Sequence, residues 1–546
     1  MIKETTMKKG LPKKTISLCP DCGKKIPATI IAEDGKAVMV KTCPEHGEIK
    51  EVIWSDVDLY LWAERYSFDG IGVENPFITK KKPSCPEDCG LCNLHKSHTV
   101  LANLDLTNRC NLTCPVCFAN ANTSGVVFEP TYEEVVKMLK VLRAEKPVPC
   151  HAVQFAGGEP TIHPDFFKIL KAAKELGISQ VQIATNGIKF AESQEFVQNS
   201  QDAGLNTIYL QFDGLDDNMY KKVRGMPMTE IKKKAIHHIR KTKQKHKMSV
   251  CLTPTIVKTV NDHMMGDIVN FAIDNIDIVH AVNFQPVSFA GRINQKEREA
   301  QRFTISDMMH GLEDQLDFLT AKDFYPVPAM TILSDLISVL HEEPKVTFSA
   351  HPHCGVGTFV FITKDKEAIP VTRFVRVTEM LDDLHRMAVK RTQGMKDQTL
   401  SYKIMKGIGS TGVAKRIAVG QFIKRYIIKN KVPDGLDVQG ILQPLFVDGD
   451  KSALSKFTWN ALMIGGMHFQ DHYNWDIERV QRCVIHYVTP DGRIIPFCNY
   501  NTGATFRTEV EKKFSIPVDE WKKMHPGSKV VEPSPLVDDY RAKMKG

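Results

Sequence analysis

The sequence has no run of eighteen apolar residues, so we expect no helix that spans a membrane. Residues 1–14 are basic but lack the apolar core of a signal peptide, which indicates a cytoplasmic protein. Charge of one sign is not in large excess either, because the formal net charge is +8 over 546 residues. That charge permits an anionic partner without identifying one. A hydrophobic content of 42% is typical of globular domains, and the length allows several of them.

Cysteine is scarce, at 14 residues, and falls in tight groups, which in a large cytoplasmic protein predict metal sites rather than disulfides. The first group is a pair of similar knuckles, "CPDCG" at 19–23 and "CPEHG" at 43–47. Glycine permits the turn of each knuckle, and backbone amides then point at the sulfurs. The spacing favours structural zinc, although a mononuclear iron fits the same ligands. The predicted ligands are Cys19, Cys22, Cys43 and His46.

A second group has three cysteines, separated by three and then by two residues, in "CPEDCGLCNLHKSH". These are Cys85, Cys89 and Cys92, and His95 and His98 follow within reach of the same metal. We predict an auxiliary metal cluster here, with a second zinc knuckle as the alternative.

The third group, in "RCNLTCPVCFAN" at 109–120, repeats this spacing with Cys110, Cys114 and Cys117 and has no fourth cysteine nearby. A structural zinc site or an ordinary ferredoxin cluster uses four protein ligands. Three thiolates on a four-iron cluster would leave one iron open. An open metal position is where chemistry takes place, so we predict a catalytic cluster at these three cysteines.

Strand and helix patterns alternate between residues 101 and 287, which predicts six βα units and a parallel sheet, either open or curved into a partial barrel. Ligands of such α/β folds bind at the carboxyl ends of the strands, where the motifs described here fall. The predicted strands are 101–107, 152–157, 180–185, 207–213, 249–256 and 280–286. The predicted helices are 131–145, 165–176, 190–203, 228–243 and 263–275.

The remainder of the chain has helical patterns at 304–345 and 374–430 and a compact region with cysteines at 440–505. "ITKDKEAIPVT" at 362–372 resembles "VTPDGRIIPFC" at 488–498, and each follows a cysteine. Both segments read as hairpins. We therefore predict that a further cluster is held by Cys354, Cys483 and Cys498. Two other cysteines lie in predicted strands and are expected in the core, Cys150 and Cys251.

The third cysteine group resembles the signature of radical S-adenosylmethionine (SAM) enzymes, Cys-x3-Cys-x2-Cys followed by an aromatic residue. The resemblance implies a partial TIM-like barrel and a 4Fe–4S cluster whose open iron binds SAM. Cleavage of SAM then yields a deoxyadenosyl radical that abstracts hydrogen. "GGEP", "ATNG", "QFDG" and "VRG" follow in the family's order and imply contacts to the methionine amino group, the ribose and the carboxylate of SAM. The implied cofactor-binding residues are Phe118, Gly157, Gly158, Glu159, Thr185, Asn186, Gln211, Asp213 and Arg224.

The layout of the whole chain resembles archaeal tetraether lipid synthases. That resemblance implies three 4Fe–4S clusters and one rubredoxin-like mononuclear iron, which moves the interpretation of the first group from zinc to iron. It also implies carbon–carbon coupling of the terminal methyl groups of archaeal diether phospholipids to give tetraether or macrocyclic lipids. The expected partners are the diether phospholipid and an electron donor such as ferredoxin.

Two features of the sequence fit a lipid substrate. Residues 400–431 contain eight lysines and arginines, no acidic residue and interleaved apolar residues, which predicts peripheral contact with the inner membrane surface. The alternative is a helix that packs one face on the core. A lipid substrate also requires an apolar tunnel, which the Met- and Leu-rich helices of 304–345 could line.

Two other functions remain open from the sequence. A radical SAM methylase or modifying enzyme acting on a pterin or a peptide would use the same core, although no cobalamin-binding segment is recognisable. A scaffold that binds nucleic acid has no need of a cofactor cradle, so we expect no nucleic-acid partner. The predicted division of the chain is a rubredoxin-like unit at 1–80, an auxiliary cluster segment at 81–100, the radical SAM core at 101–290, a helical substrate-binding region at 291–440 and a C-terminal cluster domain at 441–546.

Overall fold

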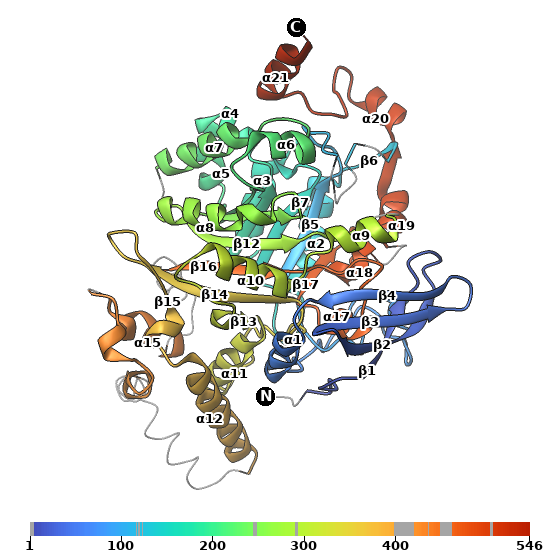
Figure 1. Cartoon of the computed structure of the whole chain (residues 1–546). Helices are drawn as coiled ribbons and strands as arrows, with labels where there is room; N and C mark the ends of the chain where they lie inside the picture. Colours follow the sequence, from blue (N-terminus) through green and yellow to red (C-terminus); the bar gives the residue numbers. More distant parts are fainter. Residues whose placement is uncertain are drawn as a thin grey trace.

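The fold is known from a computed structural model and has a long mixed sheet at its centre (Figure 1). The structure describes residues 5–115, 117, 121–122, 124–243, 248–289, 293–397, 420–434, 436–447, 461–502 and 506–545. Six neighbouring strands of the sheet are parallel and follow one another in the order of the sequence, which confirms the predicted α/β fold class. They are β5 (Leu101–Thr107), β7 (Ala152–Gly157), β8 (Gln180–Thr185), β9 (Thr207–Gln211), β10 (Ser249–Thr253) and β12 (Val279–Pro286).

Helices cover one face of these strands, and every second strand residue is buried against them. Leu104, Phe155 and Ile183 are fully buried in this core, as the period of two predicts. The five predicted helices are confirmed, as α2 (Tyr132–Arg143), α3 (Phe166–Glu175), α5 (Gln194–Asp202), α7 (Thr229–Lys241) and α8 (Met265–Asp274). Shorter elements between them are β6 (Val126–Phe128), η2 (Pro160–Ile162), α4 (Ile188–Glu192), α6 (Asp217–Arg224), β11 (Thr255–Ile256) and η3 (Asp262–Met264).

C-terminal strands extend the sheet at both of its edges. β16 (Leu462–Met467) pairs in parallel with β12, and β17 (Ile485–Val488) pairs in parallel with β5. The two predicted hairpins are confirmed, because β14 (Gly355–Ile362) pairs antiparallel with β15 (Ala368–Pro370) and β17 pairs antiparallel with β18 (Ile494–Pro496). β14 also joins β16, and β13 (Tyr325–Pro326) lies at its other side. The sheet therefore unites strands that lie far apart in the sequence.

The N-terminal strands form a separate antiparallel sheet of four in sequence order (Figure 1). They are β1 (Lys13–Leu18), β2 (Lys25–Glu33), β3 (Lys36–Cys43) and β4 (Gly47–Trp54), followed by α1 (Val57–Ala63) and η1 (Glu64–Tyr66). This sheet docks on the C-terminal region, since Thr15 Oγ1 donates to Asp476 Oδ1 at 2.6 Å and Ser17 Oγ donates to the Trp475 carbonyl at 2.5 Å.

The Met- and Leu-rich helices belong to the core. Met308, Met309 and Leu312 in α10 (Ile305–Gln315) are buried among sheet residues, so these side chains fill space where the lipid hypothesis placed a tunnel wall. The other elements are α9 (Gln295–Gln301), η4 (Ala321–Asp323), α11 (Ala329–His341), η5 (Val371–Arg373), α12 (Val377–Asp397), η6 (Lys429–Lys431), α15 (Val438–Val447), α17 (Ile477–Gln481), α18 (Phe497–Thr502), α19 (Phe506–Phe514), β19 (Ser515–Pro517), α20 (Val518–Met524) and α21 (Pro535–Lys545).

The basic stretch is described only in part, because residues 400–419 lie outside the described residues. In the part that the structure includes, Ile423 and Tyr426 are buried in a cluster with residues of α11 and α12. Their apolar side chains therefore pack on the protein, as the alternative to lipid contact predicts. Among the described residues, no helix is both long and apolar enough to cross a membrane.

Candidate metal and active sites

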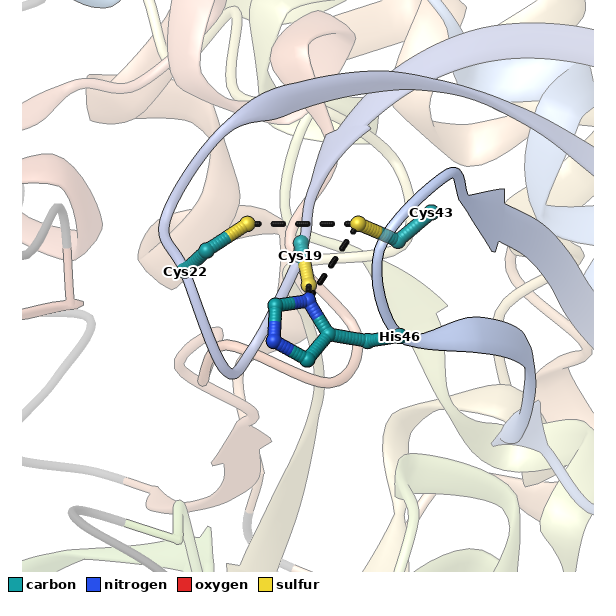
Figure 2. A group of neighbouring side chains, drawn as sticks. All are labelled: Cys19, Cys22, Cys43 and His46. Carbon is teal, nitrogen blue, oxygen red and sulfur yellow. Dashed lines mark hydrogen bonds between the residues drawn. The ribbon is translucent and has the colours of Figure 1, made fainter.

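The four side chains of the first cysteine group face one another between the β1–β2 and β3–β4 turns (Figure 2). The Cys43 Sγ lies 3.9 Å from the Cys22 Sγ and 3.4 Å from the His46 Nδ1, and the Cys19 Sγ lies 3.6 Å from the same nitrogen. All four ligand atoms lie within 4.8 Å of one another. Hydrogen bonding from His46 lowers the pKa of the Cys43 thiol to about 6. This donor set and spacing fit one tetrahedral ion.

The radical signature forms a loop directly after β5. Two of its sulfurs accept backbone hydrogen bonds, the Cys110 Sγ from Leu112 N–H and the Cys117 Sγ from Ala121 N–H, each at 3.4 Å. Burial raises the pKa of the Cys110 and Cys114 thiols, so the thiolate form needs a compensating charge. Backbone amides directed at these sulfurs fit thiolate ligands of a cluster. Phe118 lies outside the described residues.

Asn122 holds this loop in shape and was not predicted from the sequence. Its Oδ1 accepts from Cys110 N–H at 3.0 Å, and its Nδ2 donates to the Cys110 carbonyl at 3.2 Å and to the Leu112 carbonyl at 3.0 Å. Its φ of 65° lies in the left-handed region, where asparagine is tolerated better than most residues. Sequence spacing gives no sign of this role, because the bonds cross the loop.

Glu159 joins the ends of β7 and β8. One oxygen accepts from the hydroxyls of Thr161 at 2.5 Å and Thr185 at 2.8 Å, and the other accepts from Asn186 N–H at 2.9 Å. The residue is 1% exposed, and its burial raises the pKa of the carboxyl. The resemblance implied that this carboxylate meets the amino group of SAM. In the structure the carboxylate holds the ends of β7 and β8 together through the chain's own donors, and the contact with SAM stays a prediction.

The two glycines before Glu159 are required by packing within the chain. A Cβ on Gly157 would lie 2.2 Å from the Thr107 carbonyl oxygen, and one on Gly158 would lie 2.1 Å from the Arg109 carbonyl oxygen. Gly157 also has a φ of 130°. The backbone after β7 thus lies against the start of the cysteine loop, which explains the pair of glycines.

Asp213 and Arg224 form a buried ion pair beside the cysteine loop. Arg224 Nε donates to Asp213 Oδ2 at 2.7 Å and Nη2 donates to Oδ1 at 3.1 Å, while Thr255 N–H also donates to Oδ1, at 3.0 Å. Arg224 lies close enough to Cys114 to lower the pKa of its thiol, against the raising effect of burial. The resemblance gave Arg224 to the SAM carboxylate. In the structure Asp213 holds the guanidinium through two hydrogen bonds, and the contact with the SAM carboxylate stays a prediction.

Lys232 in α7 is a buried cation that the sequence analysis missed. Its Nζ donates to the Asn186 carbonyl at 2.6 Å and to Gln211 Oε1 at 2.8 Å, so it joins two of the predicted cofactor-binding segments. Burial lowers its pKa to about 7. The helical period could have indicated that Lys232 is buried, because position 232 shares a helix face with Ile236 and Ile239, which are buried.

The second cysteine group lies next to residues of α17 and β18. Its surroundings include Val480, Gln481 and Pro496, and burial raises the pKa of Cys85 to about 12. His95 also borders this space, but its Nε2 lies 2.9 Å from the Cys483 carbonyl and 3.1 Å from His486 Nε2. His98 Nε2 accepts from Thr347 N–H at 3.4 Å instead. The group as a whole is Cys85, Cys89 and Cys92.

The last cysteine group is assembled from three distant segments. Cys354 precedes β14, Cys483 precedes β17, and Cys498 lies in α18. Burial and the proximity of the other two sulfurs raise the pKa of the Cys483 thiol. Arg479 Nε donates to the Cys354 Sγ at 3.4 Å, and Gln470 N–H donates to the Cys498 Sγ at 3.3 Å. The structure therefore brings together the three cysteines that the hairpin similarity had linked.

The distances between ligand atoms distinguish the first cysteine group from the other three groups. In the part of the chain that the structure describes, only the first group brings its ligand atoms within 4.8 Å of one another. The three-cysteine groups are wider than one ion requires, which suits a larger multi-iron cluster. Cys150 and Cys251, expected in the core, are buried in it.

Comparison with known proteins agrees with this arrangement. The family description "Radical SAM superfamily" matches residues 104–272, and "HMPTM N-terminal zinc ribbon domain" matches residues 11–55. The 7,8-dihydro-6-hydroxymethylpterin dimethyltransferase of Methanocaldococcus jannaschii is 46% identical over 519 residues, which cover 94% of this chain and 98% of that protein. The chain belongs to the radical SAM superfamily, in the family of this dimethyltransferase.

More distant similarities cover less of the chain. The GTP 3',8-cyclase of Limosilactobacillus fermentum is 25% identical over 231 residues, 41% of this chain and 63% of that one. The crystal structure of Streptococcus suis SuiB bound to S-adenosylmethionine has a TM-score of 0.33 and 17% identity, over 41% of this chain and 48% of that chain.

The predicted lipid-synthase function is contradicted by the near-full-length relative, which is a pterin dimethyltransferase. The archaeal diether phospholipid substrate and the membrane contact are contradicted with it. That prediction rested on the order of cysteine groups along the chain, and cysteine order does not identify the residues that touch a substrate. The preference for a rubredoxin-like iron rested on the same resemblance, and the matching ribbon family is described as a zinc ribbon.

Proposed function

We propose that this chain is a radical SAM methyltransferase that acts on a reduced pterin, 7,8-dihydro-6-hydroxymethylpterin. The observation that carries the proposal is the 46% identity to the Methanocaldococcus jannaschii dimethyltransferase over nearly the full length of both proteins. The similarity extends over the N-terminal ribbon, the radical core and most of the C-terminal region, since it covers 94% of this chain. It is therefore not limited to the barrel that all members of the superfamily share.

The polarity of the sheet supports a polar substrate. On the face opposite the helices, Asn103, Gln154 and Gln182 lie side by side on β5, β7 and β8. Gln182 Nε2 donates to Gln154 Oε1 and Gln154 Nε2 donates to Asn103 Oδ1, both at 2.9 Å. Asn103 Nδ2 is buried and has no hydrogen-bond acceptor among the described residues. A hydrocarbon chain would leave this one amide donor unpaired, at a cost of about 1–3 kcal/mol, whereas a pterin carries hydrogen-bond acceptors.

An acidic side chain follows this layer of amides on the same face of the sheet. Asp105 lies opposite Ala156 on the neighbouring strand, one step nearer the carboxyl ends of the strands. Its carboxylate pairs with Arg507 Nη1 at 3.0 Å. A carboxylate in a dry setting accepts hydrogen bonds strongly, and the amino and ring N–H groups of a pterin are donors of that kind.

The chain's residues would have separate roles in this reaction. Cys110, Cys114 and Cys117 would hold the 4Fe–4S cluster, which together with SAM supplies a deoxyadenosyl radical. Asn122 keeps the loop in shape and Glu159 holds the strand ends that form the SAM cradle. The ribbon group would hold a structural zinc ion. The groups at 85–92 and at 354, 483 and 498 would each hold an auxiliary 4Fe–4S cluster.

The test is a product assay with the iron-loaded protein under anaerobic conditions. The protein is mixed with a reductant, 7,8-dihydro-6-hydroxymethylpterin and SAM that carries a deuterated methyl group, and the products are read by mass spectrometry. We expect 5'-deoxyadenosine together with a pterin that has gained methyl carbon, and the deuterium content identifies the methyl source. Deoxyadenosine with an unchanged pterin would contradict the proposal. C114A is the control and should form neither product.

A further inference from the structure

Arg479 is a buried cation without a carboxylate partner. It lies in α17 and is 8% exposed, and no carboxylate oxygen of the described residues lies within 4.0 Å of its guanidinium. Its Nε donates to the Cys354 Sγ at 3.4 Å, and its Nη2 donates to the His468 carbonyl. Its polar contacts in the described structure are thus a sulfur and a neutral carbonyl.

Other buried arginines of the chain are paired with carboxylates. Arg302 contacts both Glu51 and Asp471, and Arg482 contacts Asp69 at 2.9 Å. This contrast matters because a guanidinium keeps its proton in a protein, and a buried charge without a compensating charge is strongly destabilising. Arg479 therefore requires an anion, and the side chain that its guanidinium contacts is that of Cys354, whose sulfur lies 3.4 Å from Nε.

Free thiols would not supply that anion. A protonated thiol carries no charge. Thiolates coordinated to a metal cluster keep their negative charge in a dry site. A metal cluster held by these three cysteines would therefore supply the negative charge that the buried guanidinium of Arg479 lacks.

We propose that Arg479 is the counter-ion of a 4Fe–4S cluster held by Cys354, Cys483 and Cys498, and that its charge raises the reduction potential of this cluster. The inference rests on the auxiliary cluster named in the proposed function. Reduction adds one negative charge to a cluster, and a cation in hydrogen-bond contact with a ligand sulfur stabilises the reduced form more than the oxidised form. Arg479 is accordingly a positioning residue, because it acts through the cluster by changing the reduction potential of that cluster.

The second cysteine group offers a comparison within the same molecule. The cation that acts on Cys85 is Lys25, whose side chain is 34% exposed and is bonded to the Cys85 carbonyl and to Glu87. Water screens that charge, whereas the guanidinium of Arg479 is dry. The cluster at Cys354 is therefore expected to have the higher potential of the two auxiliary clusters.

The experiment is a redox titration of the full-length iron-loaded protein, followed by electron paramagnetic resonance. C354A first identifies the cluster, because its signal should disappear and the iron content should fall. R479Q should then lower the midpoint potential of that same signal or lose that cluster selectively, and R479K should restore the potential in part. R373Q is the matched control, because Arg373 pairs with Asp323 away from the cysteine groups, and it should leave every potential unchanged.

Several outcomes would overturn the proposal. An unchanged midpoint potential in R479Q would remove the role of the charge, and an unchanged iron content in C354A would remove the cluster. Near-ultraviolet circular dichroism of R479K and R479Q separates these outcomes from misfolding. None of the readouts uses a pterin, so failure of the proposed methyl transfer would leave them interpretable.

Discussion

The ribbon group and the radical loop use cysteine in opposite ways. The ribbon presents four donors within 4.8 Å of one another on two rigid turns, and it fits a closed structural site. The radical loop presents three thiols with no fourth cysteine near them in the sequence, and polar side chains from the ends of three strands, β7, β8 and β9, lie beside it. Four donors this close to one another therefore indicate a closed single-ion site, whereas three more widely spaced thiols indicate a multi-iron cluster.

The largest difference between the two sites is expected when one ligand of the radical loop is removed. C114A should abolish deoxyadenosine formation, by more than about a thousandfold, because the remaining two thiols cannot hold a cluster that binds SAM. Its ribbon metal and thermal stability should stay close to those of the parent protein. The measurement is deoxyadenosine by chromatography together with zinc and iron analysis. Retained turnover would place the reactive cluster elsewhere.

Removing one ligand of the ribbon should instead lower metal content and stability and leave the activity of the radical cluster in place. C43A should lose the ribbon metal and destabilise the four-stranded sheet, on the order of several kcal/mol, because metal binding contributes folding energy. Deoxyadenosine formation per radical cluster should be kept in the folded fraction. Metal analysis and thermal unfolding measure the effect, and C150A, a buried cysteine outside the groups, is the control that should keep all metal. Unchanged zinc in C43A would argue against the four-ligand site.

The buried ion pair beside the radical loop should contribute more to stability than an ion pair on the protein surface. D213N leaves Arg224 buried without its counter-ion and should destabilise the protein by about 3–5 kcal/mol. D277N breaks the pair with Arg240, in which the side chains are 53% and 38% exposed, and should cost less than about 1 kcal/mol. Denaturant unfolding of the two variants measures the difference. Equal effects would mean that burial does not set the strength of the inner pair.

Glu145 tests what burial alone does away from both sites. It accepts from Thr99 N–H at 2.8 Å, and burial raises its pKa from 4.5 to about 7. The folded state therefore binds more protons than the unfolded state between about pH 4.5 and pH 7, so stability falls as pH rises through that window. E145Q should remove this loss, which is at most about 1.4 kcal/mol per pH unit. Unfolding at pH 5 and pH 8 measures it, and a gain no larger at pH 8 than at pH 5 would contradict the account.

Local patterns in the sequence predicted the framework well. β5, β7 and β8 have the predicted bounds, because strands that are covered on one face by helices have clear apolar runs that end in polar motifs. The spacing of the radical and ribbon cysteines is also local, since each knuckle lies within one turn. The hairpin similarity linked Cys354 to Cys483 across more than a hundred residues, which no single motif could do.

Long-range contacts account for what the sequence did not predict. Arg479 and Lys232 are buried cations whose partners lie on other elements, and composition makes them look like surface residues. Ile423 and the methionines of α10 were read as lipid-facing, although apolar helix faces are most often core. The sequence favoured a lipid over the pterin alternative for a similar reason, because the amides of Asn103 and Gln154 become one polar layer only when the strands pair.

The most direct test of the central claim is to follow hydrogen from the pterin to the cofactor. The holoenzyme is given unlabelled SAM, a reductant and 7,8-dihydro-6-hydroxymethylpterin deuterated at its carbon-bound positions, and the deoxyadenosine is analysed by mass spectrometry. The account predicts deoxyadenosine that contains deuterium, because the radical formed at the Cys110–Cys117 loop takes hydrogen from the pterin. Deoxyadenosine without deuterium, at the same yield with and without the pterin, would contradict it.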